Sequence, residues 1–321
     1  MNEYFLGVDG GQSSTVAVIG DATGRIVGWA TSGPCNHVAS SEARAKFLGV
    51  MRECLSHAAA RAGIDLTTTR FRAACLGMSG GPEDKAALLH ELIRAEHLIV
   101  THDGRIALAG AMNGGPGVIV IAGTGSLAYG ENERGEGARA GGWGYIFGDE
   151  GGGFDIVRQA LRAMLREHEG WGPRTALTPA LLESTETADA NQALHRLYTP
   201  EWPRSRAATL AQVVSRIAEE GDPVAVEILQ GAAHSLAILA ASVRRQLWGE
   251  SAASRVACRV AWIGGVFSSP IVLERFRMLA ELEGNVTAAP PMHSPAIGAL
   301  LLACRSAGLT LVPEPGEVHK A

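Results

Sequence analysis

Glycine clusters restrict the fold of this 321-residue chain more than any other feature of its sequence. The chain has 40 glycines, and they gather in a few short stretches. Glycine lets the backbone approach another group closely. Two of the clusters, DGG after Tyr4–Val8 and GTGS after Val118–Ile121, follow apolar strand-like runs and precede a second strand-like run. This order differs from the strand–loop–helix order of a dinucleotide-binding or P-loop unit, and the sequence contains no GxxxxGK[ST] and no GxGxxG in that setting.

The composition excludes several classes of protein. Hydrophobic residues make up 46% and charged residues 19% of the chain, which indicates a globular fold. The net charge of −5 argues against a nucleic-acid partner bound through a broad basic surface. The five cysteines form no close pair and no CxxC, so we expect neither a disulfide scaffold nor a CxxC-type zinc site. The same cysteine usage predicts a cytoplasmic location. We find no signal peptide and no continuous apolar run of about 18–20 residues, and we expect no membrane partner.

Periodicity and turn residues predict the order of helices and strands. Three short strands are expected in the first thirty residues, then a helix over Ser40–Ala62 that ends at Gly63. Proline at position 82 is expected to open a second helix. Further strands are expected at Phe71–Leu76, His97–Val100, Val118–Ile121, Leu127–Tyr129 and Arg255–Ile263, with a mainly helical middle and a last helix over about 295–307.

The segment GAMNGGPG at 110–117 is the best candidate for a domain boundary. Beyond it the strand–glycine loop–strand pattern of the N-terminus starts again, so that LGVDGGQSSTVAVIG has a weak echo in VIVIAGTGSLAYG. The echo is consistent with duplication of one supersecondary unit and equally with two unrelated hairpins. We therefore expect one domain over residues 1–113 and a second over 114–294.

Three glycine loops have the character of nucleotide-binding sites, two for the phosphates and one for the adenosine. Free backbone N–H groups can line a concave surface for an anion, and hydroxyl side chains add donors. Three such loops suit a nucleotide. Asp9, at the end of the first strand, is well placed to hold a hydrated Mg²⁺. The candidate ATP-binding residues are Gly10, Gly11, Ser13, Ser14 and Thr15 in the first loop, Gly123, Thr124 and Gly125 in the second, and Gly264 and Gly265 in the third.

The densest glycine cluster, GGWGYIFGDEGGG at 141–153, has the composition of a sugar site. It contains seven glycines, the adjacent carboxylates Asp149 and Glu150, and three aromatic residues. A sugar site needs polar acceptors for hydroxyl groups together with a rigid apolar wall. The alternative is a glycine-rich hairpin that leads into a helix whose N-terminus the two carboxylates favour. The composition of this loop favours the functional interpretation.

Asp103 is the candidate general base. It follows an apolar strand and precedes a glycine and a stretch compatible with a helix. A carboxylate fixed at the end of a strand can accept a proton from a hydroxyl group. The alternative role is that of a helix N-cap, for which aspartate is also favoured. The local sequence does not favour one role over the other.

These motifs, in this order, resemble the BadF/BadG/BcrA/BcrD ATPase family and, within it, the N-acetylglucosamine kinases of the actin–hexokinase–Hsp70 superfamily. The motifs that carry the resemblance are GVDGG-QSST, CNH, THD, AGTGS, GGWGYIFGDEGGG and IGGV, and they span nearly the whole chain. Gln12 departs from the pattern, because many relatives have a third glycine there.

The resemblance implies roles for individual residues. Asp9 would orient Mg²⁺ through water, Ser13 and Thr124 would contact ATP phosphates, and Gly264 and Gly265 would form the adenosine motif. Asp103 would be the catalytic aspartate that takes the proton from the sugar 6-hydroxyl. The residues implied to bind the sugar are Asn36, Asp103, Gly142, Trp143, Gly144 and Asp149.

The resemblance also implies the fold and the reaction. The fold would be α/β, with two ribonuclease-H-like domains, each with a mixed five-stranded sheet, and an ATP/sugar cleft between them. The C-terminal helix would pack back on the N-terminal domain, and the second domain would carry a helical insertion. The reaction would be transfer of a phosphoryl group from MgATP to the 6-hydroxyl of N-acetyl-D-glucosamine, by a cytoplasmic homodimer.

Three alternatives stay open at this stage. A glucosamine kinase would bind a free amine where the acetamide is expected. A family branch in which the ATPase activates another enzyme through an iron–sulfur cluster would need suitably placed cysteines, and the C-terminal half has only Cys258 and Cys304. A sugar-responsive regulator would need a DNA-binding domain, for which the first strand, expected at about Tyr4, leaves no room.

Overall fold

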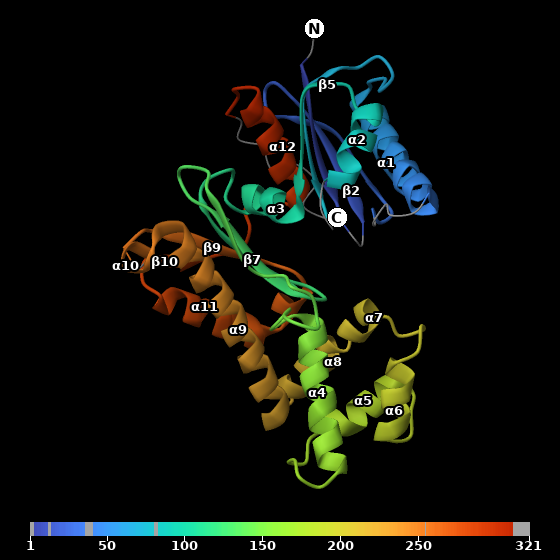
Figure 1. Cartoon of the computed structure of the whole chain (residues 1–321), viewed down its shortest axis with the longest axis vertical. Helices are drawn as coiled ribbons and strands as arrows, with labels where there is room; N and C mark the ends of the chain where they lie inside the picture. Colours follow the sequence, from blue (N-terminus) through green and yellow to red (C-terminus); the bar gives the residue numbers. More distant parts are fainter. Residues whose placement is uncertain (1–2, 12–13, 36–40, 80–82, 254, 311–321) are drawn as a thin grey trace. The chain divides into compact units, whose positions relative to one another are not determined.

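A computed structural model describes residues 3–11, 14–35, 41–79, 83–253 and 255–310 (Figure 1). The chain divides into two compact units, unit 1 (Met1–Pro116 with Pro291–Ala321) and unit 2 (Gly117–Pro290). The sequence predicts this boundary after residue 113. Each unit is built around one five-stranded sheet.

Unit 1 is a three-layer α/β unit. Its sheet has the order β3-β2-β1-β4-β5, in which β1 is antiparallel to β2 and parallel to β4. Apolar side chains alternate between two cores, so that α1 and α2 cover one face of the sheet and α3 and α12 cover the other (Figure 1). The elements are β1 (Tyr4–Gly10), β2 (Thr15–Asp21), β3 (Ile26–Ser32), α1 (Ser41–Ala62), β4 (Phe71–Met78), α2 (Glu83–Leu92), β5 (Ala95–His102), α3 (Asp103–Ala111) and α12 (Pro295–Ser306).

The C-terminal helix α12 packs very closely on β1 and α3. A Cβ atom on Gly7 of β1 would lie 2.3 Å from the backbone nitrogen of Leu300, and one on Gly298 would lie 2.0 Å from the carbonyl oxygen of Ile106. Glycine at both positions therefore permits backbone contact that any side chain would prevent. This contact fixes the helix that closes one face of the unit 1 sheet.

Unit 2 repeats the sheet arrangement of unit 1. Its order is β10-β9-β6-β7-β8, again with one antiparallel hairpin extended by a third antiparallel strand and two parallel strands on the other side. The strands are β6 (Gly117–Ala122), β7 (Ser126–Glu131), β8 (Gly137–Gly141), β9 (Cys258–Ile263) and β10 (Val286–Ala288). The helices are α4 (Gly153–His168), α5 (Leu177–Thr185), α6 (Ala190–Leu197), α7 (Arg204–Ala208), α8 (Ala211–Glu219), α9 (Pro223–Trp248), α10 (Glu250–Ala253) and α11 (Pro270–Leu282), with a 3-10 turn at Gly265–Ser268.

Helix α9 is long and apolar enough to cross a membrane by length and composition alone. Its best 18-residue window has a mean hydropathy of 1.6, and 44% of that window is buried inside the protein. The sequence analysis did not single it out because polar residues interrupt the apolar ones. Leu229, Leu236 and Val243 of α9 belong to the core of unit 2, which is the position of a core helix in a globular unit.

The predicted fold class is confirmed: both sheets are mixed and five-stranded. The predicted strands and the helices that begin near residues 41 and 295 are also present. Two short strands, β8 and β10, were missed. Strand β8 is only five residues long and reads GARAG, without the β-branched or aromatic residues that identify a strand.

Candidate active site

Two carboxylates, Asp9 and Asp103, lie at the same edge of the unit 1 sheet. Strands β1, β4 and β5 are parallel neighbours, so their carboxyl ends lie together. Asp9 is the penultimate residue of β1, and Asp103 directly follows β5 and begins α3. In open α/β sheets, ligands bind at this carboxyl edge.

Asp9 and Asp103 are close enough to influence each other's charge. Burial, together with the smaller effect of repulsion by the Asp103 carboxylate, raises the pKa of Asp9 from 3.8 to about 7. Two carboxylates that repel each other in a partly buried site are a favourable place for a cation. The described residues contain no cluster of three or more histidine, cysteine or acidic side chains. The arrangement thus fits Mg²⁺, which uses one or two carboxylates and keeps several waters.

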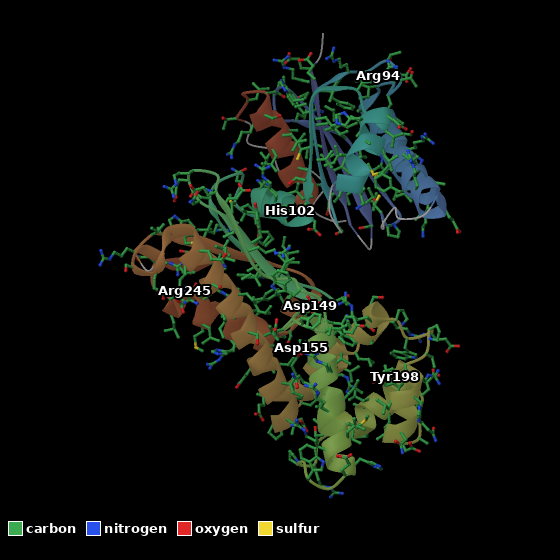
Figure 2. All side chains as sticks on the ribbon, viewed as in Figure 1. Arg94, His102, Asp149, Asp155, Tyr198 and Arg245 are labelled. Atoms are coloured by element: carbon green, nitrogen blue, oxygen red, sulfur yellow. The ribbon has the colours of Figure 1, made fainter. Side chains whose placement is uncertain are left out.

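A hydroxyl group that the sequence analysis missed fixes the Asp103 side chain. Ser79 Oγ donates a hydrogen bond to Asp103 Oδ2 at 2.6 Å, and Asp103 Oδ1 accepts from the backbone N–H of Gly104 at 2.8 Å. The N-cap of α3 is His102 (Figure 2), whose Nδ1 accepts from the N–H of Arg105 at 3.2 Å. Since His102 already caps the helix, the carboxylate of Asp103 is not needed for capping.

A buried lysine supports the segment that carries Ser79. The Lys85 side chain is fully buried, and its Nζ donates to the carbonyl oxygen of Ser79 at 3.2 Å. The N–H of Ser79 in turn donates to the carbonyl oxygen of Gly10 at 3.1 Å. These bonds join the end of β4 to the first glycine loop. The available signal in the sequence was the Ser-Gly-Gly that follows the strand at 71–78, which repeats the polar–glycine pattern of the first loop.

The side chain of Thr15 lies in the core rather than in a ligand site. It is fully buried, and its Oγ1 donates to the carbonyl oxygen of Gly33 at 2.8 Å and lies 2.9 Å from Cys35 Sγ. The Thr15 hydroxyl is therefore bonded within the core, and a contact between Thr15 and ATP stays a prediction. Thr15 is the first residue of β2 and is paired with Gly10.

The first loop is described only in part. Gly10 packs against Met78, because a Cβ atom there would lie 2.6 Å from the Met78 sulfur, so close packing alone already requires this glycine. The N–H of Gly11 donates to the carbonyl oxygen of Ser14 at 2.9 Å and closes the turn. Ser13 and Asn36, two predicted ligand contacts, lie outside the described residues.

The second loop, Gly123–Ser126, presents two backbone donors. The N–H groups of Thr124 and Gly125 donate to no residue in the described part of the chain, whereas the N–H of Gly123 is bonded to the carbonyl oxygen of Gly125 at 2.9 Å. A Cβ atom on Gly123 would meet nothing within 4 Å. Adjacent free N–H groups beside open space form the kind of concave donor site that binds a phosphate.

Asp149 (Figure 2) lies directly beneath this second loop. A Cβ atom on Gly125 would lie 2.4 Å from Asp149 Oδ2, and the N–H of Ser126 donates to Asp149 Oδ1 at 3.4 Å. Asp149 has a φ of +63°, in the left-handed region that non-glycine residues rarely adopt. Gly125 itself does not have a positive φ; it is required because the carboxylate occupies the space of its side chain.

Arg204 of α7 neutralises Asp149, and the sequence analysis did not identify it. Its Nη1 lies 2.9 Å from Asp149 Oδ2, and the Asp149 side chain is almost completely buried. No local signal in the sequence connects two residues that are 55 positions apart. Arg204 reaches Asp149 because the chain after α6 folds back toward the second loop.

The other predicted sugar contacts in unit 2 follow β8; Trp143 is exposed, and Gly142 and Gly144 are half-buried. The N–H of Gly142 donates to the carbonyl oxygen of Ser126 at 3.0 Å, and Gly142 and Gly144 both have φ between +70° and +80°. The Trp143 side chain is 69% exposed and packs on the guanidinium of Arg139, whose Cζ lies 5.1 Å from the ring centroid.

The third glycine loop, Gly264 and Gly265, lies next to the second loop. A Cβ atom on Gly264 would lie 2.2 Å from the carbonyl oxygen of Ala122, so Gly264, with φ +113°, allows the end of β9 to contact the start of the second loop. Gly265 begins the 3-10 turn and has open space at its Cβ position. Unit 2 therefore brings the predicted residues of the second loop, the third loop and Asp149 together.

Comparison with known proteins agrees with this arrangement of motifs. The sequence profile of the BadF/BadG/BcrA/BcrD ATPase family matches residues 6–303. The chain belongs to this family. Membership in an ATPase family makes ATP its nucleotide substrate and accounts for glycine loops at the ends of β1 and β6.

Three characterised kinases are similar to this chain over most of their length. An N-acetylmuramic acid/N-acetylglucosamine kinase of Clostridium acetobutylicum is 33% identical over 73% of this chain and 77% of its own. An N-acetyl-D-glucosamine kinase of Dictyostelium discoideum is 31% identical over 76% and 80%. A glucosamine kinase of Vibrio cholerae is 28% identical over 71% and 76%.

A solved structure from Chromobacterium violaceum, assigned as that of an N-acetylglucosamine kinase, shares the fold. It is similar to this chain with a TM-score of 0.71 and 27% identity, and the match covers 94% of this chain and 98% of the other. The family fold therefore extends over nearly the whole of this protein.

Proposed function

We propose that this protein transfers the γ-phosphoryl group of ATP to the 6-hydroxyl of N-acetyl-D-glucosamine. The observation that carries the proposal is the fixed carboxylate of Asp103, bonded to Ser79 and Gly104 at the carboxyl edge of the unit 1 sheet. Family membership and two relatives named for N-acetylglucosamine support it. The sugar substrate is therefore a small molecule with a primary hydroxyl group.

In the proposed mechanism Asp103 accepts the proton of the 6-hydroxyl as that oxygen attacks the γ-phosphorus. Ser79 holds one carboxylate oxygen of Asp103 and the N–H of Gly104 holds the other, so the carboxylate needs little reorganisation in the transition state. The free N–H groups of Thr124 and Gly125 bind ATP phosphate oxygens. Most of the rate enhancement would come from positioning and from neutralising charge, as in phosphoryl transfer generally.

Asp9 is the residue that we assign to Mg²⁺. A bound Mg²⁺ would neutralise charge on the ATP phosphates. Asp9 would orient it through its water ligands, and ionisation of Asp9 becomes more favourable once a cation faces it. Asn36, Gly142, Trp143, Gly144 and Asp149 remain the proposed sugar contacts, in addition to Asp103.

The ion pair between Asp149 and Arg204 favours an acetamide over a free amine at the sugar C2 position. A glucosamine ammonium needs an unpaired carboxylate, but Arg204 already neutralises Asp149. The exposed rings of Trp143, Tyr145 and Phe147 offer apolar surface to an acetyl methyl group. Glucosamine remains the second candidate substrate, because one relative is a glucosamine kinase.

The structure of the cysteine sites argues against the iron–sulfur activator alternative. Cys258 and Cys304 are both buried, and burial raises the pKa of their thiols to about 11 and about 12. Cluster ligands must be thiolates.

All five cysteines are free, which supports the cytoplasmic location that we propose. A homodimer remains a proposal from the family resemblance alone.

The test is a comparison of kcat/KM at saturating MgATP and neutral pH for N-acetylglucosamine, glucosamine, N-acetylmuramic acid and glucose, with a control that contains no sugar. We expect N-acetylglucosamine to exceed glucosamine by about 5- to 150-fold, since one buried methyl and one amide hydrogen bond contribute roughly 1–3 kcal/mol. Equal values, or a preference for the free amine, would overturn the substrate assignment. ATP hydrolysis at the same rate without sugar would overturn the kinase assignment.

A further inference from the structure

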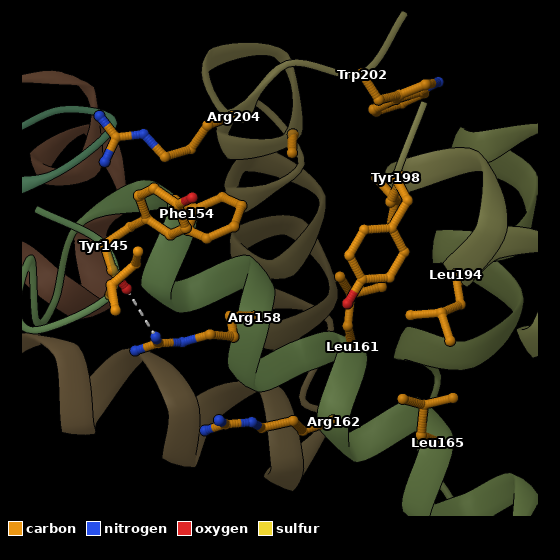
Figure 3. A pocket seen from close by; sticks show the side chains of 13 residues that line it. Tyr145, Phe154, Arg158, Leu161, Arg162, Leu165, Leu194, Tyr198, Trp202 and Arg204 are labelled. Carbon is orange, nitrogen blue, oxygen red and sulfur yellow. Dashed lines mark hydrogen bonds between the residues drawn. The ribbon is translucent and has the colours of Figure 1, made fainter. Parts of the chain in front are cut away.

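Unit 2 contains a cavity of about 580 Å³ (Figure 3), and the proposed kinase reaction involves only its rim, at Tyr145 and Arg204. It lies beside α4 and is bordered by α6 and the start of α7. Its volume falls within the range of small-molecule sites. Leu161 and Leu165 of α4 and Leu194 and Leu197 of α6 supply its apolar part.

The walls next to these leucines are aromatic. The rings of Tyr145 and Phe154 lie edge to face with their centroids 5.6 Å apart, and the guanidinium of Arg204 lies 5.2 Å from the centroid of Tyr145. Trp202 lines the cavity and is buried, whereas Tyr145 is partly open to solvent. Aromatic walls contact an apolar group with little loss of side-chain freedom, because an aromatic side chain has only two rotatable bonds.

The charged groups of the cavity are all cationic. Arg158, Arg162 and Arg204 line it, and none of the described residues that line it is acidic. Arg158 donates to Asp155 at 2.6 Å and to the carbonyl oxygen of Tyr145 at 3.1 Å. Arg204 is paired with Asp149, as described above. The positive charge of these two arginines is therefore balanced by carboxylates behind the cavity wall.

Arg162 is different because it has no hydrogen bond or ion pair with any residue that the structure describes. It is four positions after Arg158 on α4, and Figure 3 shows both side chains leaving the helix in the same direction. Leu165, Leu194 and Tyr198 lie toward the other side of α4 in this view. The cavity thus has an apolar end and an end with one uncompensated positive charge.

We infer that this cavity binds a small organic anion with an apolar ring or chain and one acidic group, such as a carboxylate or a phosphate. The apolar body contacts the leucines and the aromatic wall, and the acidic group pairs with Arg162. A single acidic group is specified because only one of the three guanidinium groups lacks a carboxylate partner. This inference does not rest on the proposed kinase activity.

Competition for a fluorescent probe tests the inference on the whole protein without ATP or sugar. The probe is 8-anilinonaphthalene-1-sulfonate, and the competitors are 4-phenylbutyrate and its uncharged amide, 4-phenylbutanamide. We expect one saturable site at which the acid competes at least tenfold better than the amide, with an advantage that shrinks as salt is added. Equal competition by the acid and the amide, or no saturable site, would overturn the inference.

Two variants and one control locate the site. Arg162→Gln should weaken acid binding about three- to tenfold and leave amide binding unchanged. The control Arg275→Gln changes an exposed arginine of α11 that also lacks a described partner, and it should affect neither competitor. Leu194→Glu places a carboxylate at the apolar end and should abolish acid binding in a protein whose melting temperature is unchanged. Equal effects of Arg162→Gln and Arg275→Gln would show that charge at this cavity does not matter.

Discussion

The carboxylate of Asp103 is fixed by hydrogen bonds, and it is not needed to cap the helix that Asp103 begins. The helix is capped by His102, and the two oxygens of Asp103 are bonded to Ser79 and to the N–H of Gly104. A general base benefits from this arrangement, because the carboxylate is oriented before the substrate arrives. These contacts therefore favour a catalytic role for Asp103 over the role of helix N-cap, which the sequence left open.

Asp103→Asn should lower kcat by about 10²- to 10⁴-fold, the usual contribution of a general base, and should leave the melting temperature nearly unchanged. The sugar Kd, measured by calorimetry, should change much less than kcat. Ser79→Ala is the matched control: it removes the hydrogen bond that orients Asp103 but keeps the base, so its loss of kcat should be smaller. Near-normal kcat in Asp103→Asn would exclude Asp103 as the base.

The raised pKa of Asp9 predicts that the free energy of unfolding of the metal-free protein depends on pH in an unusual way. Its folded-state pKa, about 7, lies above the ordinary value of 3.8, so the folded state holds a proton that the unfolded state has already lost between these values. Stability should therefore fall as pH rises from about 4 to 7, and the full penalty should be present above pH 7. Each unit of pKa difference corresponds to about 1.4 kcal/mol.

Asp9→Asn removes this penalty. In EDTA, the variant should be more stable than the wild type at pH 8, and the difference in the free energy of unfolding should shrink toward zero at pH 4. Urea unfolding at a series of pH values measures it. A constant difference across the whole range would show that Asp9 does not titrate between these limits.

At the scale of elements, the second loop combines two different uses of glycine. Gly125 is needed because the Asp149 carboxylate occupies the place of a side chain, whereas Gly123 has open space at its Cβ position. Substitution of Gly125 therefore tests packing, and substitution of Gly123 tests access of a ligand to the loop. The same loop contacts β9 through Gly264, so that three segments far apart in the sequence meet at the end of β6.

Gly123→Ala should weaken ATP binding and leave the melting temperature nearly unchanged, because its methyl group enters only the open space where a phosphate is proposed to lie. Gly125→Ala should lower the melting temperature and weaken both ATP and sugar binding, because it displaces Asp149. Calorimetry with each ligand, paired with thermal unfolding, separates the two effects. If Gly123→Ala binds ATP as the wild type does, the loop is only a β-hairpin.

Local sequence predicted the elements whose residues signal their own structure. The strands at β1, β2, β4 and β6 are apolar and β-branched runs, and the glycine loops after them are visible as motifs. What local sequence did not predict depends on contacts between distant segments. Ser79 reaches Asp103 across 24 positions and Arg204 reaches Asp149 across 55, and no periodicity connects such pairs.

The side chain of Thr15 shows how strand pairing determines the surroundings of a hydroxyl. A hydroxyl beside a glycine loop is a reasonable phosphate ligand by composition, yet the alternation of the strand turns this side chain into the core, where the carbonyl oxygen of Gly33 accepts its hydrogen bond. Which face of a strand a residue occupies at its first position depends on the pairing register. The register with β1 and β3 was not visible in the sequence.

At the scale of the whole molecule, the two units share one sheet topology. In each, a hairpin with a glycine loop is extended by a third antiparallel strand on one side and two parallel strands on the other. The weak sequence echo between the two glycine hairpins thus corresponds to equivalent positions, β1–β2 and β6–β7. Unit 1 contains the candidate base, and unit 2 contains the second phosphate loop and the candidate sugar contacts Gly142, Trp143, Gly144 and Asp149.

The central claim is that this chain phosphorylates an amino sugar on its 6-hydroxyl. Phosphorus NMR of a reaction that contains MgATP, N-acetylglucosamine and the enzyme tests it directly, because the spectrum reports both the nucleotide products and the position of the new ester. We predict that ADP and a 6-phosphate ester appear in equal amounts and that Asp103→Asn forms both far more slowly. ADP with inorganic phosphate and no sugar phosphate, with every amino sugar tried, would contradict the claim.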